Sequence, residues 1–331
     1  MTTPQTAQHA IGSGFGAQST TEEVLRGIDL TGKLAIVTGG YSGIGLETTR
    51  AFVRAGARVV VPARRREIAR EAVAGLDGVE VDELDLADLD SVRAFAERFL
   101  DSGRSIDLLI NNAGIMAAPE TRVGPGWEAQ FAVNHLGHYA LANRLWPALA
   151  RDGGARVVSV SSNGHQLSDI HWDDPHFERG YDKWQAYGQA KTANVLFAVH
   201  LDALGRDAGV RAFAVHPGVI LTQLARHLSD EELTALGLVK EDGSFADFFR
   251  TPEQGAATQV WAATSPRLAG LGGVYCEDCD IAEITEPDQA AGEAEVAGLT
   301  SGVRPYAVDP EAAARLWELS AGLTGVDAFA R

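Results

Sequence analysis

The chain has 331 residues, of which 45% are apolar and 22% are charged, a balance typical of a soluble globular protein. Its 28 Lys and Arg against 45 Asp and Glu leave a net charge of −17, which disfavours nucleic acid or an anionic membrane as a partner. No apolar run is long enough to span a bilayer, and the polar stretch 1–32 lacks the order of a signal peptide. We therefore expect a cytoplasmic protein.

Short β-branched runs bounded by glycine alternate with helical segments along the chain. We expect strands at 34–37, 58–61, 79–81, 106–110, 155–160, 210–215 and 273–276, and helices at 45–55, 66–74, 89–100, 127–150, 184–204 and 252–263. This alternation predicts βαβ units and an α/β fold with a doubly wound parallel sheet in three α/β/α layers.

No linker interrupts this pattern, so one domain is expected over residues 31–276. A flexible N-terminal leader is expected over 1–30. A C-terminal extension is expected over 277–331, with a helix around 310–321 that packs on the domain or on a partner.

A glycine-rich turn follows the first expected strand and opens a helix. Glycine at such a turn lets the backbone approach a pyrophosphate, whose charge the free N–H groups and the helix dipole would hold. A merely tight turn is the alternative. The predicted contacts are Gly39, Ser42, Gly43, Ile44 and Gly45.

The end of the second expected strand predicts the cofactor. A NAD-selective fold places an acidic residue there, but this chain has Ala63 followed by Arg64 and Arg65. Arginine pairs well with phosphate, so these residues predict NADP(H). A solvated helix start is the alternative.

Tyr187 and Lys191 lie four residues apart on an expected helix and therefore share one face. A nearby ammonium lowers the pKa of a phenol and makes it usable for proton transfer. The alternative is an ordinary helix with a half-buried Tyr and a solvated Lys.

In chain order, the glycine turn, the run Asn111-Asn112-Ala113-Gly114, Asn134, Ser162, Tyr-x-x-x-Lys and the motif Pro217-Gly218-x-x-x-Thr222 resemble the short-chain dehydrogenase/reductase family over about residues 32–275. The sequence around Tyr187 and the long insertion 163–183 resemble its retinol-dehydrogenase-like branch. The resemblance implies a Rossmann-type fold.

The resemblance also implies roles for individual residues. Ser162 would hydrogen-bond the substrate carbonyl, Tyr187 would exchange its proton, Lys191 would lower the pKa of Tyr187 and bind the nicotinamide ribose, and Asn134 would hold a water of the proton relay. The implied cofactor contacts are Asp85 and Leu86 at the adenine, Asn112, Ala113 and Gly114 where the dinucleotide crosses the strand ends, Tyr187 and Lys191, and Pro217, Gly218, Val219 and Thr222 at the carboxamide.

The predicted function is an NADP(H)-dependent carbonyl reductase or alcohol dehydrogenase that acts on a small-molecule apolar ketone, aldehyde or secondary alcohol. Two alternatives remain open: an alcohol dehydrogenase in the biosynthesis of a polyketide, terpenoid or steroid-like compound, and a cofactor-binding regulatory protein with little turnover. The resemblance is compatible with a homodimer through the helices that carry Asn134 and Tyr187, although the insertion could block some assemblies.

Three features lack an assigned role. His165, His171 and His176 of the insertion are irregularly spaced, so no metal site is expected. Cys276 and Cys279 are expected to be structural thiols, with a redox pair or half a zinc site as alternatives. The segment 223–250 is either an active-site lid or a surface helix pair.

Overall fold

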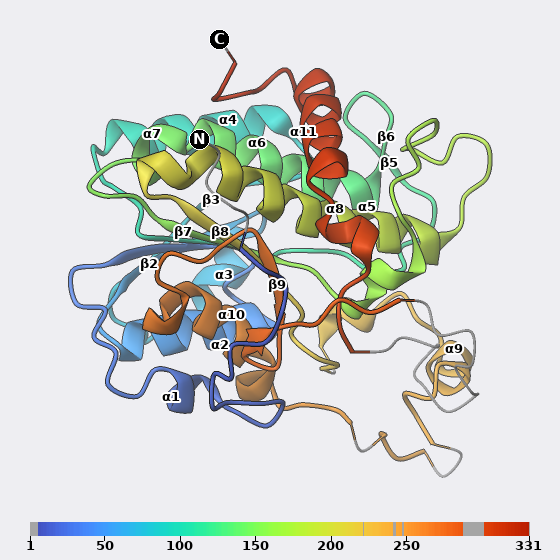
Figure 1. Ribbon diagram of the computed structural model, residues 1–331, viewed down its shortest axis with the longest axis horizontal. Coiled ribbons are helices and arrows are strands. Elements are labelled where there is room, and N and C mark those ends of the chain that lie inside the picture. Colours follow the sequence, from blue (N-terminus) through green and yellow to red (C-terminus); the bar gives the residue numbers. More distant parts are fainter. Residues whose placement is uncertain (1–5, 221, 241–242, 247, 287–300, 331) are drawn as a thin grey trace.

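The computed structural model describes residues 6–220, 222–240, 243–246, 248–286 and 301–330. Within these ranges an eight-stranded sheet crosses the molecule in the order β10-β9-β8-β7-β4-β1-β2-β3 (Figure 1). Neighbouring strands are parallel, except that β10 is antiparallel to β9. The predicted doubly wound parallel sheet is confirmed.

The seven expected strands are all present, with ends that differ by up to two residues. The strands of the large sheet are β1 (Leu34–Val37), β2 (Arg58–Ala63), β3 (Val79–Glu83), β4 (Leu108–Asn111), β7 (Arg156–Val160), β8 (Arg211–Val215), β9 (Val274–Glu277) and β10 (Asp280–Ile281). Every residue of β1 and β4 is buried, as expected for strands covered on both faces. The sequence pattern did not predict β10, which is too short to show a period.

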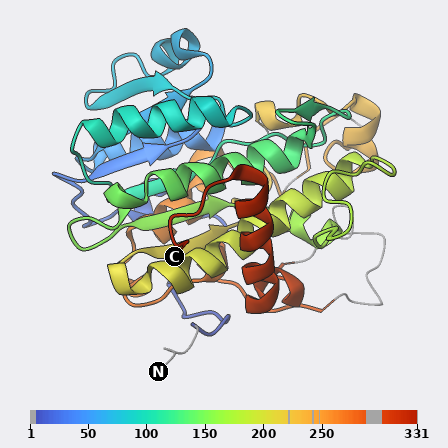
Figure 2. The same cartoon turned by 90° about the horizontal axis from the view of Figure 1, so that it is seen from above.

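Helices cover both faces of the sheet (Figures 1 and 2). One hydrophobic cluster joins the sheet to α1 (Thr21–Val24), α2 (Gly43–Arg54) and α10 (Pro252–Thr264). The other joins it to α4 (Leu89–Asp101), α6 (Gly137–Arg144), α7 (Trp146–Leu149), α8 (Lys183–Gly205) and α11 (Pro310–Thr324). The helix α3 (Arg66–Ala72) links β2 to β3. A short 3-10 turn at Arg206–Ala208 follows α8, another at Pro266–Leu268 follows α10, and a third at Pro305–Val308 precedes α11. These are the expected three layers.

The prediction of one helix over 127–150 is wrong for its first residues, which form a strand, and the remainder is divided into several shorter helices. Trp127 lies in a hairpin of β5 (Arg122–Val123) and β6 (Trp127–Glu128), followed by α5 (Ala129–Phe131), a π-helical turn (Ala132–Leu136), α6 and α7. The Glu128 carboxylate accepts hydrogen bonds from the backbone N–H groups of Gln130 (2.9 Å) and Phe131 (2.6 Å). This cap starts the helix later than the apolar period alone indicates.

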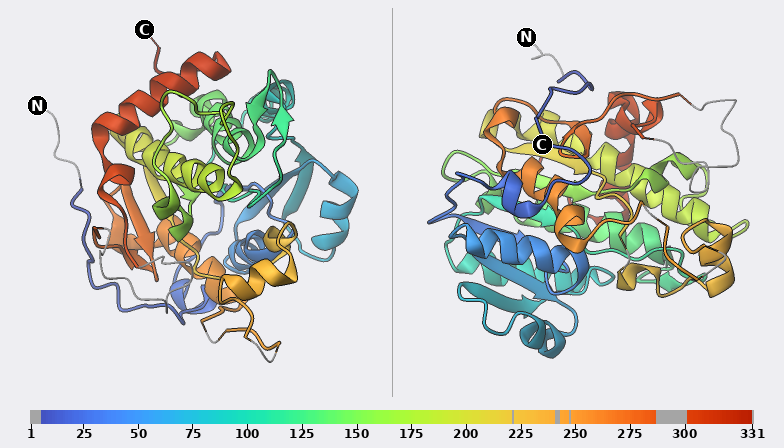
Figure 3. Two further views of the ribbon diagram at one scale, coloured as in Figure 1. Left: turned by 90° about the vertical axis from the view of Figure 1, so that its right-hand side faces the viewer. Right: turned by 90° about the horizontal axis from the view of Figure 1, so that it is seen from below.

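The N-terminal segment differs from the expected loose leader over residues 6–30. The side chain of Gln8 bonds both the N–H and the C=O of Tyr275 (2.9 and 2.7 Å), and Val24 and Leu30 are buried. The segment runs beside β9 and β10 (Figure 3). The polar composition of the segment does not indicate these contacts, because they join residues at opposite ends of the chain. Residues 1–5 lie outside the described residues.

The C-terminal helix expected around 310–321 is α11, which packs on α8 (Figure 2). The Trp317 ring stacks on Phe197 of α8, with centroids 6.0 Å apart and planes 7° apart. Residues 287–300 of the extension lie outside the described residues. Among the helices that are described, none has the length and apolar character needed to cross a bilayer.

Candidate active site

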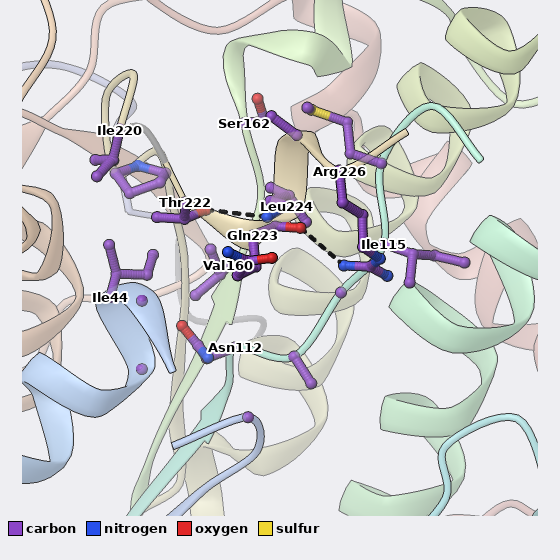
Figure 4. A pocket seen from close by; sticks show the side chains of 18 of the residues that line it. Ile44, Asn112, Ile115, Val160, Ser162, Ile220, Thr222, Gln223, Leu224 and Arg226 are labelled. Carbon is purple, nitrogen blue, oxygen red and sulfur yellow. Dashed lines mark hydrogen bonds between the residues drawn. The ribbon is translucent and has the colours of Figure 1, made fainter. Parts of the chain in front are cut away.

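A cavity of about 1410 Å3 opens at the carboxyl ends of the parallel strands, the edge where open α/β sheets bind ligands. Every predicted cofactor-binding residue lines it, as do Ser162, Tyr187 and Lys191. Figure 4 looks into this cavity, with Ser162 on one side and Ile44, Asn112 and Thr222 around it. Asn134 is fully buried and is not among the residues that line the cavity.

The glycine turn brings backbone close to this cavity. Gly39 has φ +66°, and a Cβ added at Gly45 would lie 2.4 Å from the Gly39 carbonyl oxygen, so larger residues would displace the turn. Ser42 makes no side-chain cap at the start of α2. The first N–H groups of α2 therefore fit the pyrophosphate of a dinucleotide.

The end of β2 presents positive charge to the cavity. Arg64 and Arg65 are exposed and line it, and in the described part of the chain neither has a carboxylate within ion-pair distance, whereas the neighbouring Arg66 lies 3.9 Å from Glu83. Two guanidinium groups with no carboxylate partner in the described ranges fit a phosphate.

Thr38 joins the ends of β1 and β4, although it is absent from the predicted site. Its hydroxyl oxygen accepts hydrogen bonds from the N–H groups of Asn112 (2.9 Å) and Ala113 (3.0 Å), and the Asn112 amide donates to the Thr38 carbonyl (2.8 Å). A hydroxyl directly before the glycine turn is the signal that could have identified it.

The π-helical turn places Asn134 against the backbone of Ile115. The side-chain oxygen of Asn134 accepts from the Ile115 N–H and its amide donates to the Ile115 carbonyl, both at 2.9 Å. A Cβ added at Gly114 would lie 3.1 Å from that oxygen and 3.7 Å from Lys191 Nζ. Asn134, Gly114 and Lys191 therefore meet, and π-helical turns are frequent at functional sites.

Ser162, at the end of β7, lies beside Tyr187 and Lys191 of α8. Lys191 Nζ is 5.5 Å from the Tyr187 ring centroid and donates to the Val160 carbonyl (3.1 Å). Ser162 Oγ accepts from the Gly164 N–H (3.0 Å), and a Cβ added at Gly164 would lie 2.6 Å from the Tyr187 ring. The structure thus brings the three predicted catalytic side chains together.

Burial controls the ionisation of this group. It raises the pKa of Tyr187 to about 12, against which a hydrogen bond with Ser162 acts, and it lowers the pKa of Lys191 to about 8. Lys191 is therefore still largely charged at neutral pH. That Lys191 lowers the pKa of Tyr187 stays a prediction.

The family model described as short chain dehydrogenase matches residues 33–233. The chain belongs to the short-chain dehydrogenase family. It is 45% identical to a Streptomyces lividans protein named "Probable oxidoreductase", over 89% of this chain and 98% of that protein. It is 36% identical to mouse retinol dehydrogenase 14, over 89% of this chain and 86% of that protein. Its likeness to the retinol-dehydrogenase-like branch is therefore confirmed.

Solved structures of this family share the fold. A protein from Beutenbergia cavernae that is described as an NAD(P)-dependent gluconate 5-dehydrogenase, with NADP bound at low occupancy, is 27% identical to this chain, and the match covers 76% of this chain and 96% of that one. Its TM-score is 0.58.

In this short-chain dehydrogenase, the described part of segment 223–250 forms one wall of the cavity. Its apolar lining residues are Leu224, Leu228, Leu233, Leu236, Leu238, Val239, Phe245, Phe248 and Phe249. The segment contains a 3-10 turn (Gln223–Ala225) and α9 (Asp230–Ala235), and Glu232 of α9 pairs with Lys183 of α8. This placement favours the lid over a surface helix pair.

The nicotinamide end of the predicted site lies under this wall. Thr222 Oγ1 accepts a hydrogen bond from the Leu224 N–H (3.2 Å), as Figure 4 shows. Gly218 has φ +87°, and a Cβ added there would collide with the Arg250 side chain. Leu221, inside the same motif, lies outside the described residues.

The histidines of the insertion each have separate partners. His171 lies 3.0 Å from Ser168 Oγ, His176 accepts from the Glu128 N–H at 3.4 Å, and His165 contacts Ser162. No group of three metal-ligating side chains is found among the described residues.

Cys276 and Cys279 are free and buried. Burial raises the pKa of Cys279 to about 12 and raises that of Cys276 as well. Protonated, inaccessible thiols are poor nucleophiles, which agrees with the structural role expected for both.

Proposed function

We propose that this protein is an NADP(H)-dependent carbonyl reductase that acts on an apolar ketone or aldehyde, and on the matching secondary alcohol in reverse. One observation carries the proposal: Ser162, Tyr187 and Lys191 meet in a cavity with an apolar wall at one end and, at the other, two arginines that have no carboxylate partner among the described residues.

The cofactor would lie along the strand ends. The α2 N-terminus and the glycine turn would hold its pyrophosphate, Asp85 and Leu86 its adenine, and Arg64 and Arg65 its 2′-phosphate. A bound nicotinamide dinucleotide supplies the hydride. The NADP named for the Beutenbergia cavernae structure supports a nicotinamide dinucleotide as the cofactor, and Arg64 and Arg65 favour NADP(H).

The side chains of the chain itself would handle the substrate oxygen and its proton. The Ser162 hydroxyl would hold the oxygen by a hydrogen bond, and Tyr187 would donate a proton to it during reduction and remove one during oxidation. The Lys191 ammonium, held by the Val160 carbonyl, would favour the phenolate left behind. Asn134 would fix the backbone next to Lys191.

The substrate would be apolar because the cavity wall near Ser162 is apolar. The side chains of Met116, Leu167 and Trp184 line the cavity together with the segment 223–250. Such a surface offers a substrate burial but few hydrogen-bond partners beyond those of the catalytic group.

The test is oxidation of NADPH and of NADH against a panel of ketones and aldehydes. We expect turnover with NADPH, a loss of at least about a hundredfold in kcat for Tyr187→Phe, and weaker binding mainly of NADPH for Arg64→Ala. A preference for NADH would contradict the assignment of Arg64 and Arg65. Tight NADPH binding without any turnover would favour the regulatory alternative.

A further inference from the structure

The peptide group between Ser162 and Asn163 is held at both of its polar atoms by histidines. His165 Nδ1 lies 2.7 Å from the Ser162 carbonyl oxygen, and the Asn163 N–H donates to His216 Nδ1 at 3.2 Å. His165 belongs to the 3-10 helix η2 (Asn163–Leu167), and His216 directly follows β8. Two separate elements therefore converge on one peptide plane.

The neighbours of each ring determine its tautomer. The backbone N–H of Arg304 donates to His165 Nε2 (3.1 Å), so this nitrogen carries no proton and the Nδ1–H of His165 donates to the Ser162 carbonyl. The His216 ring has the opposite tautomer: its Nδ1 accepts from the Asn163 N–H, so its proton lies on Nε2. One ring donates to the peptide group and the other accepts from it.

Both rings are held neutral in the interior. His165 is 0% and His216 7% exposed, and burial lowers their pKa values to about 4 and about 3. Neither ring therefore gains a proton near neutral pH, and each can keep its single hydrogen-bonding role.

The C-terminal extension holds His165 from the other side. Besides the N–H of Arg304, the Tyr306 hydroxyl donates to the His165 carbonyl (2.7 Å). Tyr275 of β9, just before the extension, also contacts this region: its ring lies 5.0 Å from the His165 ring, and its hydroxyl donates to the Asn163 side chain (3.1 Å). A segment far along the chain thus contacts the backbone next to Ser162.

We propose that His165 and His216 are positioning residues, which hold the Ser162–Asn163 peptide group so that the Ser162 hydroxyl faces Tyr187, and that the Arg304 N–H locks His165 in this role. The inference rests on the proposed function, in which Ser162 orients the substrate oxygen. Neither histidine is assigned contact with the reacting atoms.

Two substitutions at His165 separate its two hydrogen bonds. In His165→Asn the amide nitrogen takes the place of Nδ1 and keeps the bond to Ser162, whereas in His165→Gln the longer side chain reaches Arg304 and leaves the Ser162 carbonyl without this donor. With NADPH and a ketone that the wild type reduces, we expect kcat to fall about tenfold in His165→Gln and only about twofold in His165→Asn. The Kd for NADPH, measured by fluorescence, should stay the same in both.

A matched pair at Arg304 tests the lock. Arg304 has φ −72°, which proline can adopt, so Arg304→Pro removes the N–H together with the side chain, while Arg304→Ala removes the side chain alone. We expect the larger fall in kcat for Arg304→Pro. An equal fall in kcat in both variants would assign the effect to the Arg304 side chain and overturn the proposal that the Arg304 N–H holds His165.

Nitrogen NMR of isotope-labelled full-length protein tests the arrangement without any turnover. We expect the Nδ1–H tautomer at His165 and the Nε2–H tautomer at His216, assigned by loss of each signal in His165→Gln and His216→Asn. Other tautomers, or equal losses of kcat and thermal stability in the two His165 variants, would overturn the proposal. An active Tyr187→Phe would instead contradict the proposed function and leave the tautomers as they are.

Discussion

At the scale of single residues, Lys191 combines burial with charge. It is 4% exposed and has no carboxylate partner among the described residues. Its charged form is stabilised by the hydrogen bond to the Val160 carbonyl, but burial still lowers its pKa. A buried charge of this kind lowers stability and is kept where chemistry needs it.

We predict that Lys191→Met abolishes turnover and stabilises the fold. The folded pKa is about 8 against an ordinary 10.5, so removing the charge should raise the free energy of unfolding at neutral pH by on the order of 3 kcal/mol. The Val160 carbonyl keeps its second donor, Asn194 (2.9 Å). Urea unfolding monitored by tryptophan fluorescence checks this.

The pH dependence provides the control for that prediction. Between pH 8 and 10.5 the unfolded chain binds the Lys191 proton more tightly than the folded protein does, so the contribution of Lys191 to wild-type stability rises with pH across this window. The advantage of Lys191→Met should therefore shrink over the same window. A constant difference between the two proteins would mean that packing, and not charge, explains the stabilisation.

At the scale of elements, the wall over the cavity is attached through α9. The Lys183–Glu232 ion pair joins it to α8, and a capping box between Ser229 and Glu232 starts the helix. Both side chains of the pair are partly exposed, so the pair contributes little to overall stability. Its effect should be confined to the wall.

We predict that Lys183→Met loosens this wall and leaves the cofactor end unchanged. The KM for an apolar ketone should rise up to about threefold, cleavage by trypsin within the segment should quicken, and the Kd for NADPH should stay constant. Arg93→Met, which removes an exposed pair on α4, is the matched control. An equal rate of cleavage within the segment in wild type and Lys183→Met would show that the pair does not restrain α9.

At the scale of the whole molecule, the C-terminal extension is part of the domain. Trp317 of α11 is 5% exposed and contacts the rings of Phe197, Tyr139 and Phe329. Because α11 covers this face of α8, a homodimer through the same face would require α11 to move. The expected homodimer stays a prediction.

We predict that Trp317→Ala lowers the free energy of unfolding by about 3 kcal/mol, the usual range for removing a buried tryptophan. Glu318→Ala, at the neighbouring exposed position, should change it by less than about 0.5 kcal/mol. Chemical denaturation measures both. Similar values for the two variants would mean that α11 unfolds separately from the domain.

The sequence by itself determined the order of strands and helices and most of the site. Buried strands leave β-branched runs, and a glycine turn, an Asn-Asn-Ala-Gly run and Tyr-x-x-x-Lys are local patterns. These patterns single out Gly39, Asn112 and Tyr187, which line one cavity in the structure. Parallel strands bring their carboxyl ends to a common edge whatever connects them.

Only the tertiary structure decided what holds these residues in place. His216 lies 53 residues from Asn163, and Arg304 lies 139 residues from His165, while the N-terminal segment reaches β9 through Gln8. Such contacts leave no period or spacing in a single sequence, because each depends on two distant segments meeting after the sheet has formed. The sequence therefore specifies which side chains the proposed site contains, and the fold specifies their orientation.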